Sequence, residues 1–168
     1  MITEISNLSV SILLSCVVGE DISKVKINFW ERGRLVQKDL SYCLRETFTQ
    51  MVDRLALPHI SLFPQLLDVY ITPHERDILA NCRTIRGLVL DYVNKRRAEL
   101  QSGAVPKQDL LTLMLTDMKW TDERALIDEL LTVFFAGSQT TAVVTENLIM
   151  YLQKSPESAR KLLDEIDA

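Results

Sequence analysis

The sequence predicts an all-α fold, and three observations support that prediction. Apolar residues recur at intervals of three and four along most of the 168 residues. One such pattern runs unbroken over residues 122–154, which corresponds to a helix of about 50 Å. Alternating apolar and polar residues never extend far enough to indicate strands of useful length. We therefore expect several helices arranged around one long helix.

The N-terminal part is expected to contain two helices and two irregular stretches. Residues 3–18 and 39–56 have apolar residues at helical spacing, and Gly19 suits the C-terminal cap of the first helix. Polar residues and glycine interrupt residues 20–38, so a loop with short helical turns is expected there. A proline ends the second helix, and the apolar residues 59–70 are expected to form a buried or pocket-edge loop.

The third helix has the clearest start in the chain. Thr72 can cap the helix, Pro73 suits its first turn, and Glu75 can complete a capping box. The pattern continues to about Leu100. Residues 101–108 then contain glycine and proline, which predicts a flexible link.

The C-terminal part is expected to contain a short helix, the long helix and a final helix. Residues 109–118 form the short apolar pattern. Thr121 is the expected cap of the long helix, with acidic residues favourably placed in its first turn. The long helix ends near Lys154. Ser155 then caps a last helix that begins at Pro156 and is barely formed when the sequence ends.

The centre of the long helix has an unusual composition. Residues 130–144 are nearly free of charge, which predicts burial on all sides within a larger body. Gly137 costs about 1 kcal/mol relative to alanine in a helix, and Thr140 and Thr141 are β-branched. Together these residues place small and polar groups on one face, where a flat ligand can lie or the helix can bulge around a small molecule. Close helix packing or a kink is the alternative explanation.

The segment Ala136-Gly137-x-x-Thr140-Thr141, inside a long apolar helix, resembles the distal helix of cytochromes P-450, the haem-thiolate monooxygenases. The following Ser155-Pro156-Glu157 and residues 161–166 resemble the next helix of that family. The resemblance implies that residues 1–168 are an internal part of the fold, from the E helix to the J helix, and form no complete independent domain. The first hundred residues match in layout only.

The resemblance also implies which residues of the long helix would contact the haem and the substrate. The expected haem-binding residues are Ala136, Gly137, Thr140 and Thr141. The expected substrate-pocket residues are Thr132, Phe135 and Ala136. Thr140 would place its hydroxyl beside bound dioxygen, in a mostly dry pocket with one relay for protons.

Gln139 departs from the family pattern, which usually has an acid before the threonine. An amide can hydrogen-bond and orient water, but it cannot donate and recover a proton as a carboxyl group does. Gln139 and Thr140 are therefore the candidate catalytic residues, with proton delivery either slow or carried by water.

The remaining parts of the family site are not expected within this sequence. Glu31 to Arg34 and Glu157 to Arg160 match Glu-x-x-Arg literally, but both stand in the wrong place for the family pair and are interpreted as surface charge pairs. The three cysteines, at positions 16, 43 and 82, all precede the long helix, whereas the axial thiolate of the family follows it. We expect them to pack in the core, and we expect no metal ligand in this chain. His59 and His74 could in principle bind iron, but neither has a partner pattern, and a surface position is expected for His74.

Cofactors and partners follow from the resemblance. The complete protein would bind haem b, receive electrons from NADPH through a reductase, and oxidise a small lipophilic substrate. The net charge of −4 and the pI of about 5.2 give no indication of a nucleic-acid surface. The basic cluster noted in the sequence, residues 95–97, lies late in a helix, where it suits the helix dipole.

Residues 2–19 are the membrane or targeting candidate in the sequence, and we interpret them as a helix packed on protein. No membrane anchor is therefore visible. By family analogy, a full-length protein with an N-terminal anchor would lie in the endoplasmic reticulum membrane, and one without it in the cytoplasm.

Other interpretations stay open. The chain could be a non-catalytic all-helical interaction module, which would need a complete core of its own, or a truncated relic product. A small helical enzyme using Asp or Glu residues is a third possibility, but no metal-spaced cluster supports it. On the family reading, the chain alone would be inactive and prone to self-association, because part of its apolar surface would lack a cover.

Overall fold

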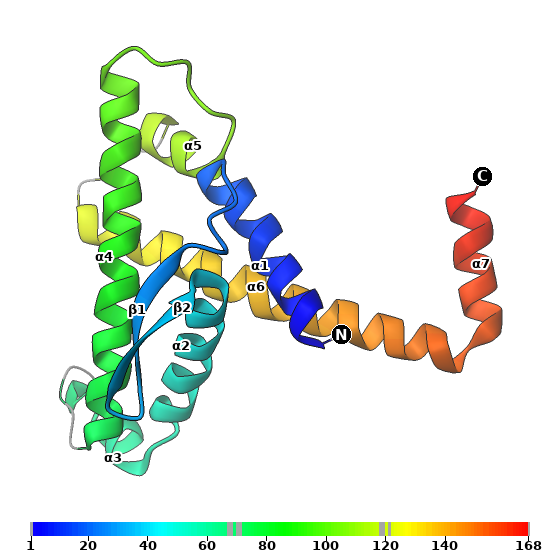
Figure 1. Ribbon diagram of the computed structural model, residues 1–168, viewed down its shortest axis with the longest axis horizontal. Coiled ribbons are helices and arrows are strands. Elements are labelled where there is room, and N and C mark those ends of the chain that lie inside the picture. The colour runs from blue at the N-terminus through cyan, green and yellow to red at the C-terminus, as the bar shows by residue number, and fades with distance from the viewer. Residues whose placement is uncertain (1, 67–68, 70–71, 118–119, 121, 168) are drawn as a thin grey trace.

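The computed structural model describes residues 2–66, 69, 72–117, 120 and 122–167. Figure 1 shows a helical body from which the C-terminal part of the chain extends as an arm. The elements in chain order are α1 (Ile2–Val18), β1 (Lys26–Glu31), β2 (Arg34–Asp39), α2 (Leu40–Leu55), α3 (Pro58–Leu62), a 3-10 turn (Pro64–Leu66), α4 (Pro73–Gln101), α5 (Leu110–Asp117), α6 (Glu123–Lys154) and α7 (Pro156–Ile166). The predicted all-α class is confirmed, with one small sheet added.

The hydrophobic core lies where five helices meet. Each contributes fully buried side chains, among them Leu14 of α1, Leu44 of α2, Ile85 of α4, Leu111 of α5 and Leu130 of α6. Helix α1 crosses α6 and packs closely along it. The interpretation of residues 2–19 as a helix packed on protein is thus confirmed. In the part of the chain that the structure describes, no helix is both long and apolar enough to cross a membrane.

The expectation of a loop with helical turns at residues 20–38 was wrong. Strands β1 and β2 pair antiparallel from Lys26 with Asp39 to Glu31 with Arg34. The two-residue turn between them has positive φ at both positions, 51° at Arg32 and 74° at Gly33, as in a type I′ hairpin. The glycine three residues after Trp30, with apolar residues on both sides of the turn, was the signal that the helical interpretation missed.

The expected pocket-edge loop at residues 59–70 is also corrected, within the residues that are described. Its first part forms α3 and the 3-10 turn, and most of its apolar side chains face solvent, with Leu62 72% exposed. Ile60 is buried. The buried guanidinium of Arg54 donates to the carbonyl of Val69 at 2.7 Å. This stretch is therefore a folded connection whose backbone carbonyls hold a buried cation.

The predicted helix starts can be compared directly with the structure. Thr72 accepts a hydrogen bond from the Glu75 amide at 3.2 Å and the Glu75 carboxylate accepts one from the Thr72 amide at 2.9 Å, so the capping box is confirmed. The predicted cap at Thr121 lies outside the described residues. Asp122 is the observed cap of α6, because its carboxylate accepts from the Arg124 amide at 2.9 Å. Ser155 precedes α7 as expected, without a side-chain capping bond, and α7 is a full helix of 11 residues.

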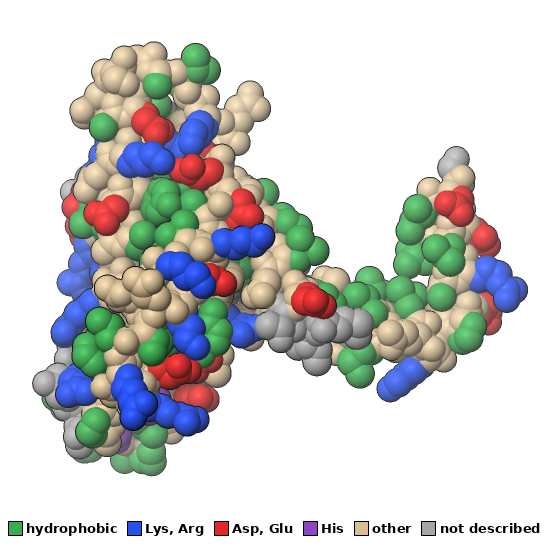
Figure 2. Space-filling model, in the orientation of Figure 1, with side chains coloured by type: hydrophobic (Ala, Val, Ile, Leu, Met, Phe, Trp, Pro, Cys, Tyr) green, Lys and Arg blue, Asp and Glu red, His purple; other side chains and the backbone are tan. Residues whose placement is uncertain are grey.

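Burial along α6 differs from the prediction for residues 130–144. Every fourth residue on one face is buried, whereas Val143 and Val144 on other faces are 46% and 66% exposed. The exposed apolar surface continues along α7, where Ile166 is 70% exposed. Figure 2 shows it as green along the arm, which consists of the C-terminal end of α6 and of α7. Within the described residues, α6 is covered on one side only.

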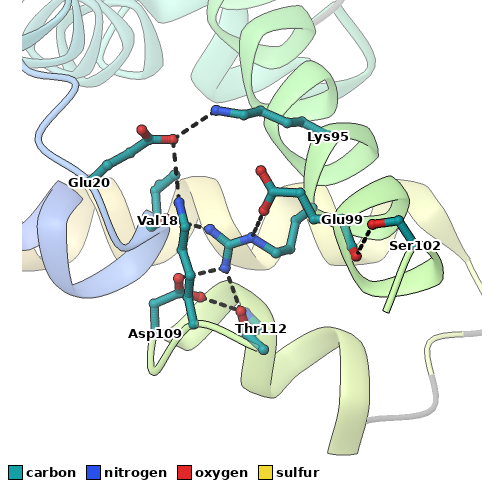
Figure 3. Close-up of polar contacts among 9 residues, drawn as sticks. Val18, Glu20, Lys95, Glu99, Ser102, Asp109 and Thr112 are labelled. Carbon is teal, nitrogen blue, oxygen red and sulfur yellow. Dashed lines mark hydrogen bonds and ion pairs between the residues drawn. The ribbon is translucent and has the colours of Figure 1, made fainter. Parts of the chain in front are cut away.

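A buried cluster around Arg96 joins the ends of α1, α4 and α5. The Arg96 guanidinium donates to the carbonyl of Val18 at 2.8 Å, to Asp109 Oδ2 at 2.5 Å and to the Thr112 hydroxyl. Its fourth acceptor is the Glu99 carboxylate, at 2.9 Å. Figure 3 shows these acceptors converging from three elements. The cluster therefore fixes both ends of the link predicted as flexible at residues 101–108.

The basic cluster at residues 95–97 does more than complement a helix dipole. Lys95 pairs with Glu20 at 3.1 Å, and Arg97 pairs with Glu123 of α6. Arg96 is buried against Asp109. All three cations therefore tie α4 to acids from other parts of the chain, which the sequence position alone could not reveal.

Gly19 is expected to be intolerant of substitution. Its φ is +75°, and an added Cβ would overlap the carboxylate of Asp109. We expect Gly19→Ala to lower the free energy of unfolding by more than the roughly 1–2 kcal/mol typical of a left-handed residue alone. Gly103→Ala is the matched control, because Gly103 has φ +77° but no neighbouring atom within 4 Å. Urea unfolding followed by circular dichroism measures both, and equal losses would contradict the overlap.

Candidate functional site

Helix α6 is a regular α-helix through its glycine. No bulge interrupts the segment between Glu123 and Lys154. The Thr140 hydroxyl donates to the carbonyl of Ala136 at 2.6 Å, one turn earlier. The Thr132 hydroxyl makes the same bond to Asp128, at 2.8 Å. These back-bonds satisfy the hydroxyl protons within the helix.

The two faces of α6 differ in exposure. Phe134, Ser138 and Ala142 follow one another at four-residue spacing on the buried face. Thr132, Ala136 and Thr140 repeat at the same spacing and are exposed. We call these three residues the open stripe. The structure therefore brings the predicted pocket residues Thr132 and Ala136 into line with the predicted catalytic Thr140.

Gly137 lies beside α1. A Cβ at this position would meet the Leu13 side chain at 3.0 Å, which is closer than ordinary packing. The adjoining Ser138 carbonyl accepts a hydrogen bond from the Ser9 hydroxyl at 3.1 Å. The glycine thus permits the close approach of α1 and α6, which was the alternative explanation for its presence. Its contact with a haem stays a prediction.

The remaining predicted site residues lie around this segment. Phe135 is half-buried and packs against Phe48 of α2, with ring centroids 5.5 Å apart. Gln139 is half-buried, and Thr141 is exposed with its carbonyl accepting the Thr145 hydroxyl at 2.8 Å. Phe135 is therefore turned toward α2, whereas Thr141 borders solvent.

The open stripe can carry one kind of polar chemistry in this geometry. Because the Thr140 hydroxyl donates its proton to Ala136, its oxygen faces solvent as an acceptor. It can donate outward only after it releases the Ala136 carbonyl.

The cysteines occupy three different environments. Cys43 is fully buried, and burial raises the pKa of its thiol to about 12. Burial also raises the pKa of Cys82, which is half-buried. Cys16 is exposed, so its predicted core position was wrong. The described residues include no group of three or more His, Cys, Asp or Glu that could hold a metal ion.

The histidines also differ from each other. His74 is exposed, as expected. His59 has a partner that the sequence did not indicate, because its Nε2 lies 2.9 Å from Oε1 of the buried Glu75. Its contact with the capping residue of α4 is structural, and only the capping-box pattern at Glu75 could have pointed to it.

Thiol labelling provides a test of these environments. In the native protein, an alkylating reagent at mildly basic pH is expected to modify Cys16 first and to leave Cys43 largely unmodified, because only thiolates react and Cys43 is buried with a raised pKa. Mass spectrometry of peptides over time gives the order. Labelling in urea is the control, and similar native rates for Cys16 and Cys43 would contradict the structure.

Comparison with known proteins identifies the family to which the chain is related. It matches the family model described as Cytochrome P450 over residues 3–168. It is 29% identical over 121 residues to beta-amyrin 28-monooxygenase of Barbarea vulgaris, which covers 71% of this chain and 25% of that protein. It is 24% identical over 161 residues to cytokinin hydroxylase of Arabidopsis thaliana, which covers 89% of this chain and 30% of that protein.

The chain thus spans about a quarter of the length of the first of these relatives. No solved structure matches it significantly. The family model nevertheless covers nearly every residue, including the open stripe and both helices that carried the resemblance. The chain belongs to the cytochrome P450 family.

Proposed function

We propose that this chain is part of a haem-dependent monooxygenase and supplies its distal oxygen-activation helix with part of the substrate pocket. The observation that supports this best is the open stripe of α6. A segment of the family type, Ala136 to Thr141, stands with Ala136 and Thr140 exposed while the opposite face packs on α1. Because this face is uncovered among the described residues, its small and hydroxylated side chains are accessible to a ligand.

The residues of the open stripe fit one face of a haem. Ala136 offers no side chain beyond Cβ, and Thr140 adds a hydroxyl one turn away. When bound, the haem would supply the activation of dioxygen. Ala136 and Thr140 would hold its distal side, and Thr141 is the neighbouring proposed contact. The thiolate for the iron would come from another part of the protein, because all three cysteines of this chain precede α6, whereas the axial thiolate of the family follows the distal helix.

Thr140 is the proposed residue for proton handling. Its oxygen can accept a hydrogen bond from a water or a bound molecule while the hydroxyl still donates to the Ala136 carbonyl. Exchange of that bond for an outward one would let the hydroxyl donate. Gln139 could orient a water beside it but cannot exchange a proton as an acid would, so we propose that water delivers the proton.

The rest of the proposal concerns the whole protein. The apolar surface of the arm, including Leu148 at 50% and Leu163 at 59% exposed, suits a cover provided by a larger body. Residues 1–168 would then be a partial domain, inactive alone. A small lipophilic substrate and electrons from NADPH through a reductase complete the proposed reaction. The uncovered arm also fits a helical interaction module, and the experiment below separates the two.

The test uses the longest reading frame that contains this sequence, expressed with haem. We expect a thiolate-type reduced carbon-monoxide spectrum for the wild type and for Thr140→Ala alike. Product formed per NADPH should fall roughly a hundredfold in Thr140→Ala, with peroxide rising, because proton delivery is misplaced. Thr140→Ser should retain most of the coupling, and Thr141→Ala is the control on the next position.

Two results would count against the proposal. A longer protein that binds no haem would favour the interaction module. A Thr140→Ala variant with unchanged coupling would remove the proposed role of that hydroxyl while leaving the family membership intact.

A further inference from the structure

The hairpin turn carries a strained cation. Arg32 has φ 51°, and it is the one non-glycine residue with positive φ in the described ranges. The first central position of such a turn favours Asn, Asp or Gly, which tolerate this conformation better than a long side chain does. Strain of this kind is usually kept where a side chain has a function. The formation of the turn therefore does not explain why an arginine occupies this position.

Helix α4 holds the turn in place. The Asp77 carboxylate accepts a hydrogen bond from the Gly33 amide at 2.6 Å. Asn81 pairs with the backbone of Trp30 in both directions, at 2.7 Å and 2.9 Å. Asp77 and Asn81 are both buried. The backbone that presents Arg32 is thus fixed in advance, which lowers the entropy lost when a ligand binds.

The cations at the turn are not neutralised by the chain. Arg32 and Arg34 are exposed, and neither guanidinium has an ion-pair or hydrogen-bond partner among the described residues. The neighbouring Glu31 is engaged, since it accepts from the Tyr42 hydroxyl at 3.1 Å and pairs with Lys38 at 3.5 Å. These free cations contrast with the paired cations of α4.

The charge of the hairpin opposes that of the whole chain. The hairpin, residues 26–39, contains four Lys or Arg and two acids, whereas the chain carries a net charge of −4. Figure 2 shows blue side chains gathered toward the lower end of the body, where Figure 1 places the hairpin. A shallow hollow at the turn is lined by Glu31, Arg32, Arg34 and Val36. A local positive field of this kind attracts anions.

We propose that this turn is a binding site for phosphate esters, with the guanidinium groups of Arg32 and Arg34 as its ligands. A guanidinium offers paired N–H donors that match two phosphate oxygens, and both exposed cations of the turn are arginine rather than lysine. The phosphate can belong to a soluble molecule or to a lipid headgroup. The proposal is independent of haem binding and of the role of α6.

The test exploits the strain at Arg32. Arg32→Asn removes the cation and puts a favoured residue in the turn, so the thermal midpoint should stay equal or rise. Arg34→Gln removes the second cation. Arg124→Gln is the matched control, because the Arg124 side chain is 78% exposed at the start of α6, away from the hairpin. Circular dichroism confirms that each variant is folded.

Two probes distinguish the source of the phosphate. Calorimetry with inorganic pyrophosphate measures binding to a soluble phosphate compound. Co-flotation with phosphatidylcholine vesicles, with and without phosphatidic acid, measures binding to a lipid phosphate. We expect the wild-type protein to bind in at least one of these two assays and not to bind vesicles of phosphatidylcholine alone. Affinity should fall about fivefold for each arginine removed and stay unchanged in Arg124→Gln.

Binding to pyrophosphate would identify a site for soluble phosphate compounds, and binding only to phosphatidic acid would identify a lipid site. Both results support the proposal. The proposal would be overturned if the wild-type protein bound in neither assay, or if Arg124→Gln lost as much affinity as the turn variants. A lower thermal midpoint in Arg32→Asn would also overturn it, because Arg32 would then serve the fold.

Discussion

Replacing Arg96 by alanine is expected to lower the free energy of unfolding by about 3–5 kcal/mol. The side chains of Arg96 and Asp109 are 4% and 0% exposed, so removing the guanidinium leaves a buried carboxylate without its cation. The carbonyl of Val18 and the Thr112 hydroxyl lose a partner as well. Urea unfolding at low protein concentration, followed by circular dichroism, measures the loss.

The matched control is the next residue along α4. Arg97 also forms an ion pair, with Glu123, but its side chain is 37% exposed. Arg97→Ala should therefore cost less than about 1 kcal/mol, as exposed pairs do. If Arg96→Ala and Arg97→Ala lost similar amounts, the buried cluster would not be holding the ends of α1, α4 and α5 together.

The same cluster gives an expected pH dependence. Burial raises the pKa of Asp109, but hydrogen bonds from Arg96 and Thr112 outweigh it and leave the pKa below its ordinary value of 3.8. The pKa of Asp109 is lower in the folded protein than in the unfolded protein. The stabilisation that its carboxylate gains from Arg96 and Thr112 is therefore complete above the unfolded pKa and is lost as the pH falls through the folded pKa. Acid unfolding of Asp109→Asn, compared with wild type, should show a weaker dependence in that range.

Leu130→Ala is expected to lower the free energy of unfolding by about 3–5 kcal/mol. Leu130 is 2% exposed and lies in the core where α6 meets the other helices. The substitution removes buried methyl groups and leaves a cavity that the surrounding helices can only partly fill. The same urea experiment measures the change, and a loss below about 1 kcal/mol would show that α6 is not docked as described.

Leu148 lies on the same helix and serves as the control. It is 50% exposed on the arm, so Leu148→Ala should change stability by less than about 1 kcal/mol in this chain. If a larger body covers the arm in the complete protein, the same substitution should cost several times more there. An equally small effect in the complete protein would argue against that cover.

Local sequence patterns predicted the helices because their causes are local. The capping box at Thr72 and Glu75 depends on residues three apart, and the residues themselves supply both hydrogen bonds. The positive φ of Gly19 follows from the end of α1 in the same way. The hairpin was missed because its strands are short and lie beside polar residues, and because its stability comes partly from Asn81 and Asp77 of α4.

In the candidate site, too, some features follow from local sequence and others from the tertiary structure. Spacing alone aligned Thr132, Ala136 and Thr140, since residues four apart share one side of a helix. Which side would be open depended on α1, more than a hundred residues away in sequence. The contact of Leu13 with the Gly137 position could not be inferred from either segment by itself.

By itself the sequence determined that the chain is helical, where most helices begin and end, and that α6 carries a segment of the cytochrome P450 type. These properties arise from interactions between near neighbours in the chain. Only the tertiary structure decided that Arg96 is buried. It also decided that, among the described residues, one side of α6 is packed and the other open, Arg32 has no partner and the arm has no cover. Those outcomes depend on which distant surfaces exclude water from each other, which no local pattern specifies.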